Sequence, residues 1–241
     1  LRASIQLGLP TIVRGDSNAL RPRPVWKEAG HRALLSCFDA FVAVGRANRA
    51  FYERNGVRPD RIVDGGHFVD EDHFLSLRAR ELPRRFELRR RWGIPEGAFC
   101  PLFAGKLQPK KRPLDFIAAL SDVVGRVPQG RIHGLVVGSG ELYEEARRVA
   151  KANAVPLTFT GFLNQTEIGC AYAAADALVL PSDWGETWGL VVNEAMLFGL
   201  PAIVSDRVGS GPDLVSEGET GFVVPYARPD VLAERICELA L

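Results

Sequence analysis

Cysteine is scarce in this sequence, with only four among 241 residues. The four lie far apart, and no two of them form a Cys-x-x-Cys pair. Such spacing fits neither a metal site nor a disulfide framework, so we expect free thiols in a reducing, cytoplasmic compartment. The cysteines are Cys37, Cys100, Cys170 and Cys237.

Long apolar runs and a strong net charge are also absent. The longest apolar stretch, from Gly189 to Val204, is broken by Asn193 and Glu194, which excludes a membrane-spanning segment. The formal net charge of +1 argues against a general nucleic-acid-binding protein.

The charge is nevertheless uneven along the chain, because residues 1–98 carry +6 and residues 99–241 carry −5. A cluster of five arginines holds much of the positive excess. It is either a solvated helix face or a contact with an anionic membrane surface or lipid carrier, which would make the protein peripheral to the membrane. The cluster comprises Arg84, Arg85, Arg89, Arg90 and Arg91.

From residue 99 onward, short apolar runs alternate with helical patterns. Continuous runs of this length are typical of strands that are buried on both faces of a parallel sheet. Their alternation with helices predicts right-handed crossovers and a doubly wound α/β fold of the Rossmann type. The runs cover residues 99–104, 132–137, 157–160, 177–180, 202–204 and 222–224.

Residues 1–98 hold fewer such elements. Three short strands are expected at 10–13, 40–44 and 62–63, with helices at about 24–36 and 47–55. The run Asp70-Glu71-Asp72 breaks the apolar pattern and predicts a boundary. We therefore expect the C-terminal part of one Rossmann-like domain at 1–72 and a near-complete second one at 73–241.

The segment from Pro181 to Met196 is the richest in chemistry. It follows an expected strand and opens a helix, so it lies at the carboxyl edge of the sheet, where such folds bind ligands. Glu186 is expected in the loop and Glu194 inside the helix. Eight positions at the helical rise would place their backbones about 12 Å apart, a span comparable with a diphosphate that links two sugars. The backbone N–H groups at the helix start would point toward the anion between them. Those groups belong to Trp188, Gly189 and Leu190.

Two further turns follow expected strands. Lys106 and Lys111 come after Gly105 and would flank a diphosphate, although loop lysines are more often simply solvated. The turn Gly138-Ser139-Gly140 lacks the full Gly-x-Gly-x-x-Gly fingerprint. A nicotinamide-dependent dehydrogenase, which needs that fingerprint, is therefore disfavoured.

These segments together resemble the retaining glycosyltransferases of the GT-B fold, family 4. The Glu186–Glu194 pair matches the family's Glu-x7-Glu motif, and the resemblance extends over nearly the whole chain. It also includes 103–107 with Lys111, 137–140, 159–162, 174–182, Gly199, Pro201, Gly209 and 220–221, and upstream 61–63, 69–70 and Phe74.

The resemblance implies roles for particular residues. Lys106 and Lys111 would bind the donor's phosphates, Glu186 the hydroxyls of the transferred sugar, and Glu194 the ribose. Gly189 and Leu190 would supply backbone donors. The remaining nucleotide-site positions are Gly105, Gly138, Gly161, Phe162 and Trp188.

The sequence departs from the family pattern at three places. Trp188 stands where Phe is common, and Arg112 replaces a usual Gly, which puts the tightness of that turn in question. The first-domain His is replaced by Arg14-Gly15-Asp16-Ser17, in which Asp16 either contacts sugar or acceptor or caps a turn.

The resemblance thus predicts an enzyme that moves a hexose-type sugar, with retention, from a nucleoside-diphosphate sugar to a glycan or lipid-linked acceptor. No cofactor and no metal is expected, since no Asp-x-Asp motif or His cluster suggests a metal site; the one Asp-x-Asp run, Asp70-Glu71-Asp72, marks the expected boundary. A non-catalytic sugar-nucleotide-binding fragment is the alternative, because we expect the chain to be truncated at its N-terminus and to transfer sugar poorly by itself. The nucleotide base, the sugar and the acceptor are not specified by the sequence.

Overall fold

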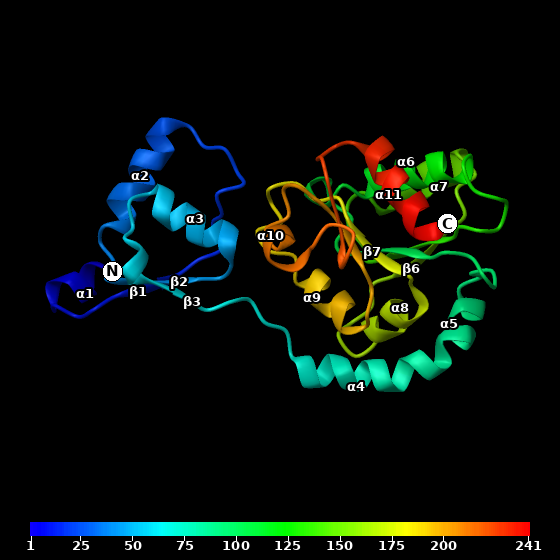
Figure 1. Cartoon of the computed structure of the whole chain (residues 1–241), viewed down its shortest axis with the longest axis horizontal. Coiled ribbons are helices and arrows are strands. Elements are labelled where there is room, and N and C mark those ends of the chain that lie inside the picture. The colour runs from blue at the N-terminus through cyan, green and yellow to red at the C-terminus, as the bar shows by residue number, and fades with distance from the viewer. The chain divides into compact units, whose positions relative to one another are not determined.

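The computed structural model describes all 241 residues, Leu1–Leu241, and divides into two compact units. Unit 1 comprises Leu1–His67 and unit 2 comprises Phe68–Leu241. Both are α/β structures with parallel sheets, as expected from the sequence (Figure 1).

Unit 1 is built on a three-stranded parallel sheet in the order β1-β2-β3. Phe41, Phe51 and Tyr52 form the centre of its core, with the rings of Phe41 and Tyr52 5.0 Å apart. Every expected element of this unit is present within about two residues. The elements are α1 (Arg2–Gln6), β1 (Ile12–Arg14), α2 (Val25–Leu35), β2 (Ala40–Ala43), α3 (Arg46–Arg54), η1 (Pro59–Arg61) and β3 (Ile62–Asp64).

Unit 2 contains a six-stranded parallel sheet in the order β6-β5-β4-β7-β8-β9. The strand order reverses between β4 and β7, which creates a topological switch point at the carboxyl edge of the sheet. The strands are β4 (Pro101–Ala104), β5 (Gly134–Val137), β6 (Leu157–Gly161), β7 (Ala177–Leu180), β8 (Ala202–Ser205) and β9 (Gly221–Val224).

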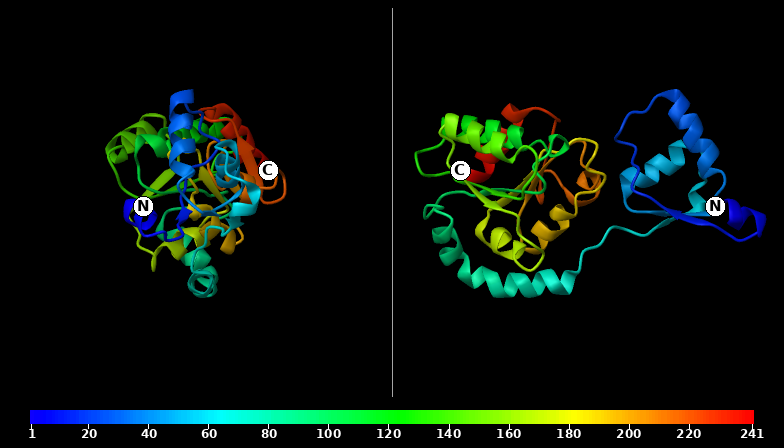
Figure 2. Two further views of the ribbon diagram at one scale, coloured as in Figure 1. Left: turned by 90° about the vertical axis from the view of Figure 1, so that its left-hand side faces the viewer. Right: turned by 180° about the vertical axis from the view of Figure 1, so that it is seen from behind.

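Helices cover both faces of this sheet. The helical elements are α4 (Glu71–Glu81), η2 (Leu82–Arg84), α5 (Arg85–Arg91), η3 (Pro109–Lys111), α6 (Pro113–Val124), α7 (Tyr143–Ala152), α8 (Ile168–Ala174), α9 (Leu190–Leu197), α10 (Gly211–Leu214) and α11 (Pro229–Ala240). Helices α6, α7 and α11 lie on one face, and α8 and α9 lie on the other (Figures 1 and 2).

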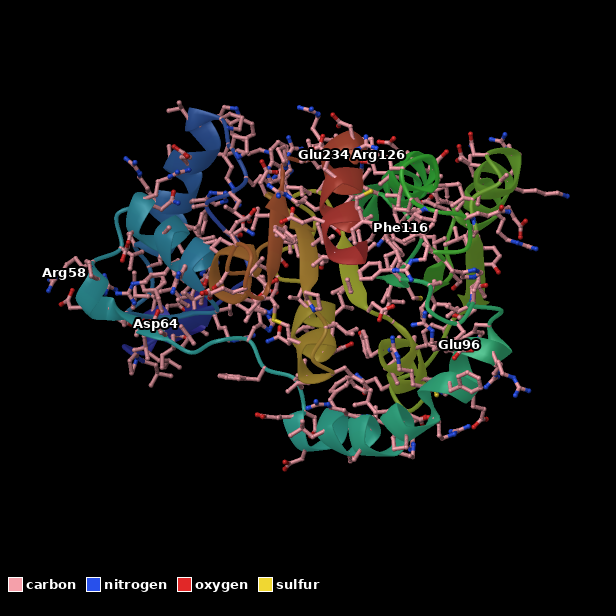
Figure 3. All side chains as sticks on the ribbon, turned by 45° about the vertical axis from the view of Figure 1, so that its right-hand side comes forward. Arg58, Asp64, Glu96, Phe116, Arg126 and Glu234 are labelled. Atoms are coloured by element: carbon pink, nitrogen blue, oxygen red, sulfur yellow. The ribbon has the colours of Figure 1, made fainter.

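The strands bury side chains alternately toward the two faces. In β4, Leu102 belongs to the apolar cluster under α8 and α9, whereas Phe103 belongs to the cluster under α6 and α11. Phe116 of α6 is fully buried between the helices and the sheet, with its ring 5.9 Å from that of Phe103 (Figure 3). Burial on both faces explains why these strands are continuous apolar runs in the sequence.

The acidic run at 70–72 begins a helix in unit 2, whereas the sequence pattern placed a domain boundary after it. Asp70 caps α4 by accepting a hydrogen bond from the backbone N–H of His73 at 3.0 Å. Glu71 and Asp72 occupy the first turn, where acidic side chains interact favourably with the helix dipole. The structure divides the chain between His67 and Phe68, five residues before the expected position.

The arginine cluster is only partly a solvated face. Arg85 donates to Asp176 at 2.6 Å, and Arg89 donates to the same carboxylate at 3.1 Å. These bonds connect α5 to the loop that precedes β7, so the two side chains have a structural role. Arg90 and Arg91 are exposed.

Candidate functional site

Three turns meet at the carboxyl edge of the unit 2 sheet and are joined by backbone hydrogen bonds. The N–H of Gly105 donates to Val137 O at 3.0 Å, and the N–H of Gly138 donates to Gly161 O at 2.8 Å. Gly138 has a φ of +133°, and a Cβ atom there would lie 1.9 Å from Gly105 O. Only glycine allows this close approach, so the expected turns after β4, β5 and β6 form one rigid edge.

A pocket of about 510 Å³ opens against these turns. This volume lies within the usual range for small-molecule sites. Its wall is mostly apolar and backbone, with one basic and one acidic side chain, Lys106 and Glu194. The lining residues include Gly105, Lys106, Gly138, Phe162, Tyr172 and Glu194.

Glu194 is fixed in the pocket wall by a buried tyrosine. The Tyr172 hydroxyl donates a hydrogen bond of 2.5 Å to Glu194 Oε2. Burial raises the pKa of the Glu194 carboxyl above its ordinary value, and the bond from Tyr172 opposes the rise. Burial and the neighbouring carboxylate raise the pKa of the Tyr172 phenol well above its ordinary value. The phenol therefore remains a donor, and the other Glu194 oxygen is available for a ligand hydroxyl.

Lys111 and Glu186 form a direct ion pair next to the pocket. Both side chains are mostly buried, with 15% and 13% exposed, and Ser182 Oγ donates to Glu186 Oε2 at 3.3 Å. A Cβ atom at Gly105, which lines the pocket, would lie 3.9 Å from Lys111 Nζ. The structure thus brings Lys111, Glu186, Lys106 and Glu194 to one edge of one sheet.

The turn that carries Lys111 is tight, although Arg112 rather than glycine stands at its end. Arg112 adopts the left-handed conformation, with φ 56° and ψ 45°, which glycine would adopt without strain. Its guanidinium forms two hydrogen bonds of 2.8 Å with Asp115 in the first turn of α6. The left-handed backbone costs about 1–3 kcal/mol, and this partly exposed ion pair offsets only part of that strain.

Glu186 lies in the loop and Glu194 inside the helix, as expected, but the separation calculated from helical rise over all eight positions is wrong for the first half. Helix α9 begins at Leu190, and Gly189 before it has a φ of +98°. Only the four steps from Leu190 to Glu194 follow the helical rise, about 6 Å. Glu186 lies in a turn in which its N–H donates to Asp183 O at 3.0 Å.

The other predicted positions lie around this edge in different environments. Gly161 accepts the bond from Gly138, and Phe162 is 72% exposed at the pocket. Trp188 is buried, and its Nε1 donates to Asn193 Oδ1 at 2.8 Å. Leu190 begins α9 and is 38% exposed.

Asp16 belongs to unit 1, where it follows β1. Its carboxylate lies 3.5 Å from Nε2 of His67, which follows β3, and the His67 side chain is 16% exposed. His67 was not expected from the sequence. The signal available was weak, since a lone histidine after Gly65-Gly66 carries no motif, and only the parallel pairing of β1, β2 and β3 brings it to Asp16.

A larger cavity of unit 2, about 830 Å³, lies at the opposite edge of the sheet. Its wall includes Ala98, Arg131 and Asp176, which precede β4, β5 and β7, and also Glu96 (Figure 3). Two of its arginines, Arg85 and Arg89, are already bonded to Asp176. Lys106 and Glu194 line the smaller pocket at the carboxyl edge instead.

Two other kinds of feature are absent from the structure. No group of three or more His, Cys, Asp or Glu side chains is placed so that it could hold a metal ion. None of the helices has both the length and the apolar character needed to cross a membrane.

Known proteins share both the sequence and the fold. The chain is 33% identical over 241 residues to a D-inositol 3-phosphate glycosyltransferase of Streptomyces bingchenggensis, covering 95% of this chain and 50% of that protein. It is 40% identical over 158 residues to the sulfoquinovosyl transferase SQD2 of Arabidopsis thaliana, covering 64% of this chain and 28% of that protein. The chain therefore spans about half the length of the first of these relatives and less of the second.

Solved structures show the same architecture. The Anabaena protein Alr3699/HepE, solved in complex with UDP, superposes with a TM-score of 0.77 at 20% identity, covering 98% of this chain and 64% of that chain. The lipopolysaccharide outer core galactosyltransferase WaaB superposes with a TM-score of 0.72 at 15% identity, covering 99% and 62%. These likenesses establish the GT-B fold.

The model of the family described as glycosyl transferases group 1 matches residues 84–240, the greater part of unit 2 with its pocket and both glutamates. The chain belongs to the glycosyl transferases group 1 family.

Proposed function

We propose that this chain binds a nucleoside-diphosphate sugar and serves a retaining glycosyltransferase reaction in which a hexose-type sugar is moved to a glycan or lipid-linked acceptor. The observation that carries the proposal is the pocket against three glycine turns, with Lys106 and Glu194 in its wall and the Lys111–Glu186 pair beside it. The names of the glycosyltransferase relatives, and the UDP bound to the Anabaena protein, support the same donor class.

The charges of the site suit the three parts of such a donor. We assign the two ammonium groups of Lys106 and Lys111 to the diphosphate, which carries the negative charge. Glu194 Oε1, which Tyr172 leaves available, accepts hydrogen bonds from ribose hydroxyls. The Glu186 carboxylate accepts hydrogen bonds from hydroxyls of the sugar.

The reaction needs charge stabilisation at the leaving group more than a strong base. As the anomeric C–O bond breaks, negative charge develops on the diphosphate, and prepositioned lysines stabilise it in the transition state. The acceptor hydroxyl then attacks from the face that the leaving group vacates, so that the anomeric configuration is kept. Holding the partners at this geometry contributes the rest of the rate enhancement.

The acceptor side of the proposal depends on unit 1 and on the surface. We assign Asp16 to a contact with sugar or acceptor, oriented by His67. The exposed Arg90 and Arg91 suit an anionic membrane surface, which would place a lipid-linked acceptor near the enzyme. In this proposal, Lys106 and Lys111 stabilise the charge of the diphosphate, so the reaction needs no metal or cofactor.

Donor hydrolysis tests this function. The chain is incubated with UDP-, GDP- and ADP-hexoses, and release of nucleoside diphosphate and the anomer formed first are followed by NMR. Because the chain alone is expected to transfer sugar poorly, release is followed over long incubations, and we expect slow release from one donor with the anomeric configuration kept. An inverted first product would contradict the retaining mechanism, binding without release would support a non-catalytic sugar-nucleotide-binding role, and no binding would contradict both.

A further inference from the structure

An arginine is held between two aromatic rings beside the loop that carries Glu186. The rings of Trp184 and Tyr226 are stacked, with centroids 6.4 Å apart and planes 14° apart. The guanidinium carbon of Arg207 lies 3.6 Å from the Trp184 centroid and 3.5 Å from the Tyr226 centroid. Both aromatic faces therefore attract the same cation, and the planar guanidinium fits between them.

The sandwich links loops that are distant in sequence. Trp184 follows β7, Arg207 follows β8 and Tyr226 follows β9, so three adjacent strand ends contribute one residue each. The backbone N–H of Tyr226 also donates to Asp206 Oδ1 at 3.0 Å. Arg112, at the end of the lysine turn, lies 5.1 Å from the Tyr226 centroid.

The backbone of Glu186 is connected to this sandwich on both sides. Trp184 lies two residues before Glu186 in the same turn. Gly209, two residues after Arg207, donates its N–H to Glu186 O at 3.1 Å. A Cβ atom at Gly209 would lie 1.7 Å from Thr187 O, so the two loops are already at their closest possible approach.

We propose that Arg207 is a positioning residue that fixes the Glu186 loop for contact with the transferred sugar. Resting on the proposed function, this inference concerns the sugar half of the site alone. Most of the nucleotide half is built from other elements, namely the glycine turns after β4, β5 and β6 and Tyr172 of α8, and Lys111 joins it to the Glu186 loop through its ion pair with Glu186. Removal of the Arg207 guanidinium should therefore weaken sugar binding strongly and change nucleoside diphosphate binding little.

Calorimetric titration with a nucleoside diphosphate and with the matching nucleotide sugar provides the test. In the unaltered chain, Glu186→Gln is expected to weaken nucleotide-sugar binding at least tenfold. Arg207→Ala should cause a similar loss while changing diphosphate affinity less than twofold. In the Arg207→Ala background, Glu186→Gln should then reduce the affinity for the nucleotide sugar by less than a further twofold, because the carboxylate is no longer held in place.

Two control variants separate positioning from general stability, and a third variant is a substitute for Arg207→Ala. Tyr226→Phe keeps both rings and should leave nucleotide-sugar affinity unchanged. Arg235→Ala removes another stacked arginine, 4.9 Å from the Phe222 centroid, and should leave both affinities unchanged even if the melting temperature falls. Arg207→Met keeps an unbranched side chain between the rings, and it replaces Arg207→Ala in the titrations if that variant does not fold.

The outcomes are distinct. If the unaltered chain binds neither ligand, the proposed function fails and this inference fails with it. If it binds both but Arg207→Ala and Arg207→Met keep the tenfold effect of Glu186→Gln, only the positioning role is overturned. An equal loss of affinity for both ligands in the Arg207 variants would also overturn the positioning role, since that result indicates general damage to unit 2.

Discussion

Replacement of Lys111 by methionine separates the functional role of the Lys111–Glu186 pair from its structural role. Lys111 is 15% exposed and Glu186 is 13% exposed, so the pair is largely shielded from water. After Lys111→Met, the Glu186 carboxylate keeps only the bond from Ser182 Oγ. An under-bonded buried charge of this kind costs about 1–3 kcal/mol of unfolding free energy.

The same change removes one cation from the diphosphate. A hydrogen bond between charged groups contributes about 1.5–3 kcal/mol, so affinity for a nucleoside diphosphate should fall about 10- to 150-fold. For a chain of this size the melting temperature should fall by about 2–12 °C. Differential scanning fluorimetry measures the stability change, and calorimetric titration measures the affinity.

The double variant Lys111→Met/Glu186→Gln separates the two effects. With the unpaired charge removed, stability should return close to that of the unaltered chain. Diphosphate affinity should remain low, because the cation is still missing. If stability and affinity recover together, the pair is a structural ion pair only and our assignment of Lys111 to the phosphates is refuted.

Three further changes test other parts of the site and the fold. Glu194→Gln should weaken nucleotide binding at least tenfold, yet stabilise the fold increasingly as pH rises above the ordinary carboxyl range. Burial raises the folded-state pKa of Glu194, so the free-energy penalty of ionising its carboxyl in the folded chain is absent at low pH and complete above that pKa. Chemical denaturation of both chains at several pH values measures this difference in unfolding free energy. Gly138→Ala should reduce diphosphate affinity at least tenfold and lower stability by about 1–3 kcal/mol, because its Cβ would meet Gly105 O; unchanged titration curves would contradict the close approach of these turns. Thiol labelling under native conditions should modify exposed Cys37 first and spare Cys100, since burial raises the Cys100 pKa to about 12; early modification of Cys100 would argue against its buried position.

The sequence predicted the fold well because each strand of unit 2 is buried on both faces. Residues 177–180, for example, form β7 with the expected bounds. Helix ends were less predictable. The start of α9 depends on the left-handed backbone of Gly189. The start of α4 depends on the cap at Asp70, and an acidic run in a sequence is equally compatible with a helix start and with a linker.

The site was predictable where it follows a local motif and not where it depends on long-range packing. Lys106, Glu194 and the glycine turns were expected from their positions after strands, and the structure places them around one pocket. Arg207 was not expected, because its partners Trp184 and Tyr226 come from different loops. No local pattern in the sequence indicates that three strand ends will bring these side chains together.

The most direct test of the central claim is calorimetric titration of the unaltered chain with UDP, GDP, ADP and NAD. The claim is that the pocket at the carboxyl edge of the unit 2 sheet binds the nucleoside diphosphate of a sugar donor. We predict that at least one of the three diphosphates binds at one site per chain, that Gly138→Ala weakens this binding at least tenfold, and that NAD does not compete. Binding of NAD alone, or of none of the four ligands, would contradict the account.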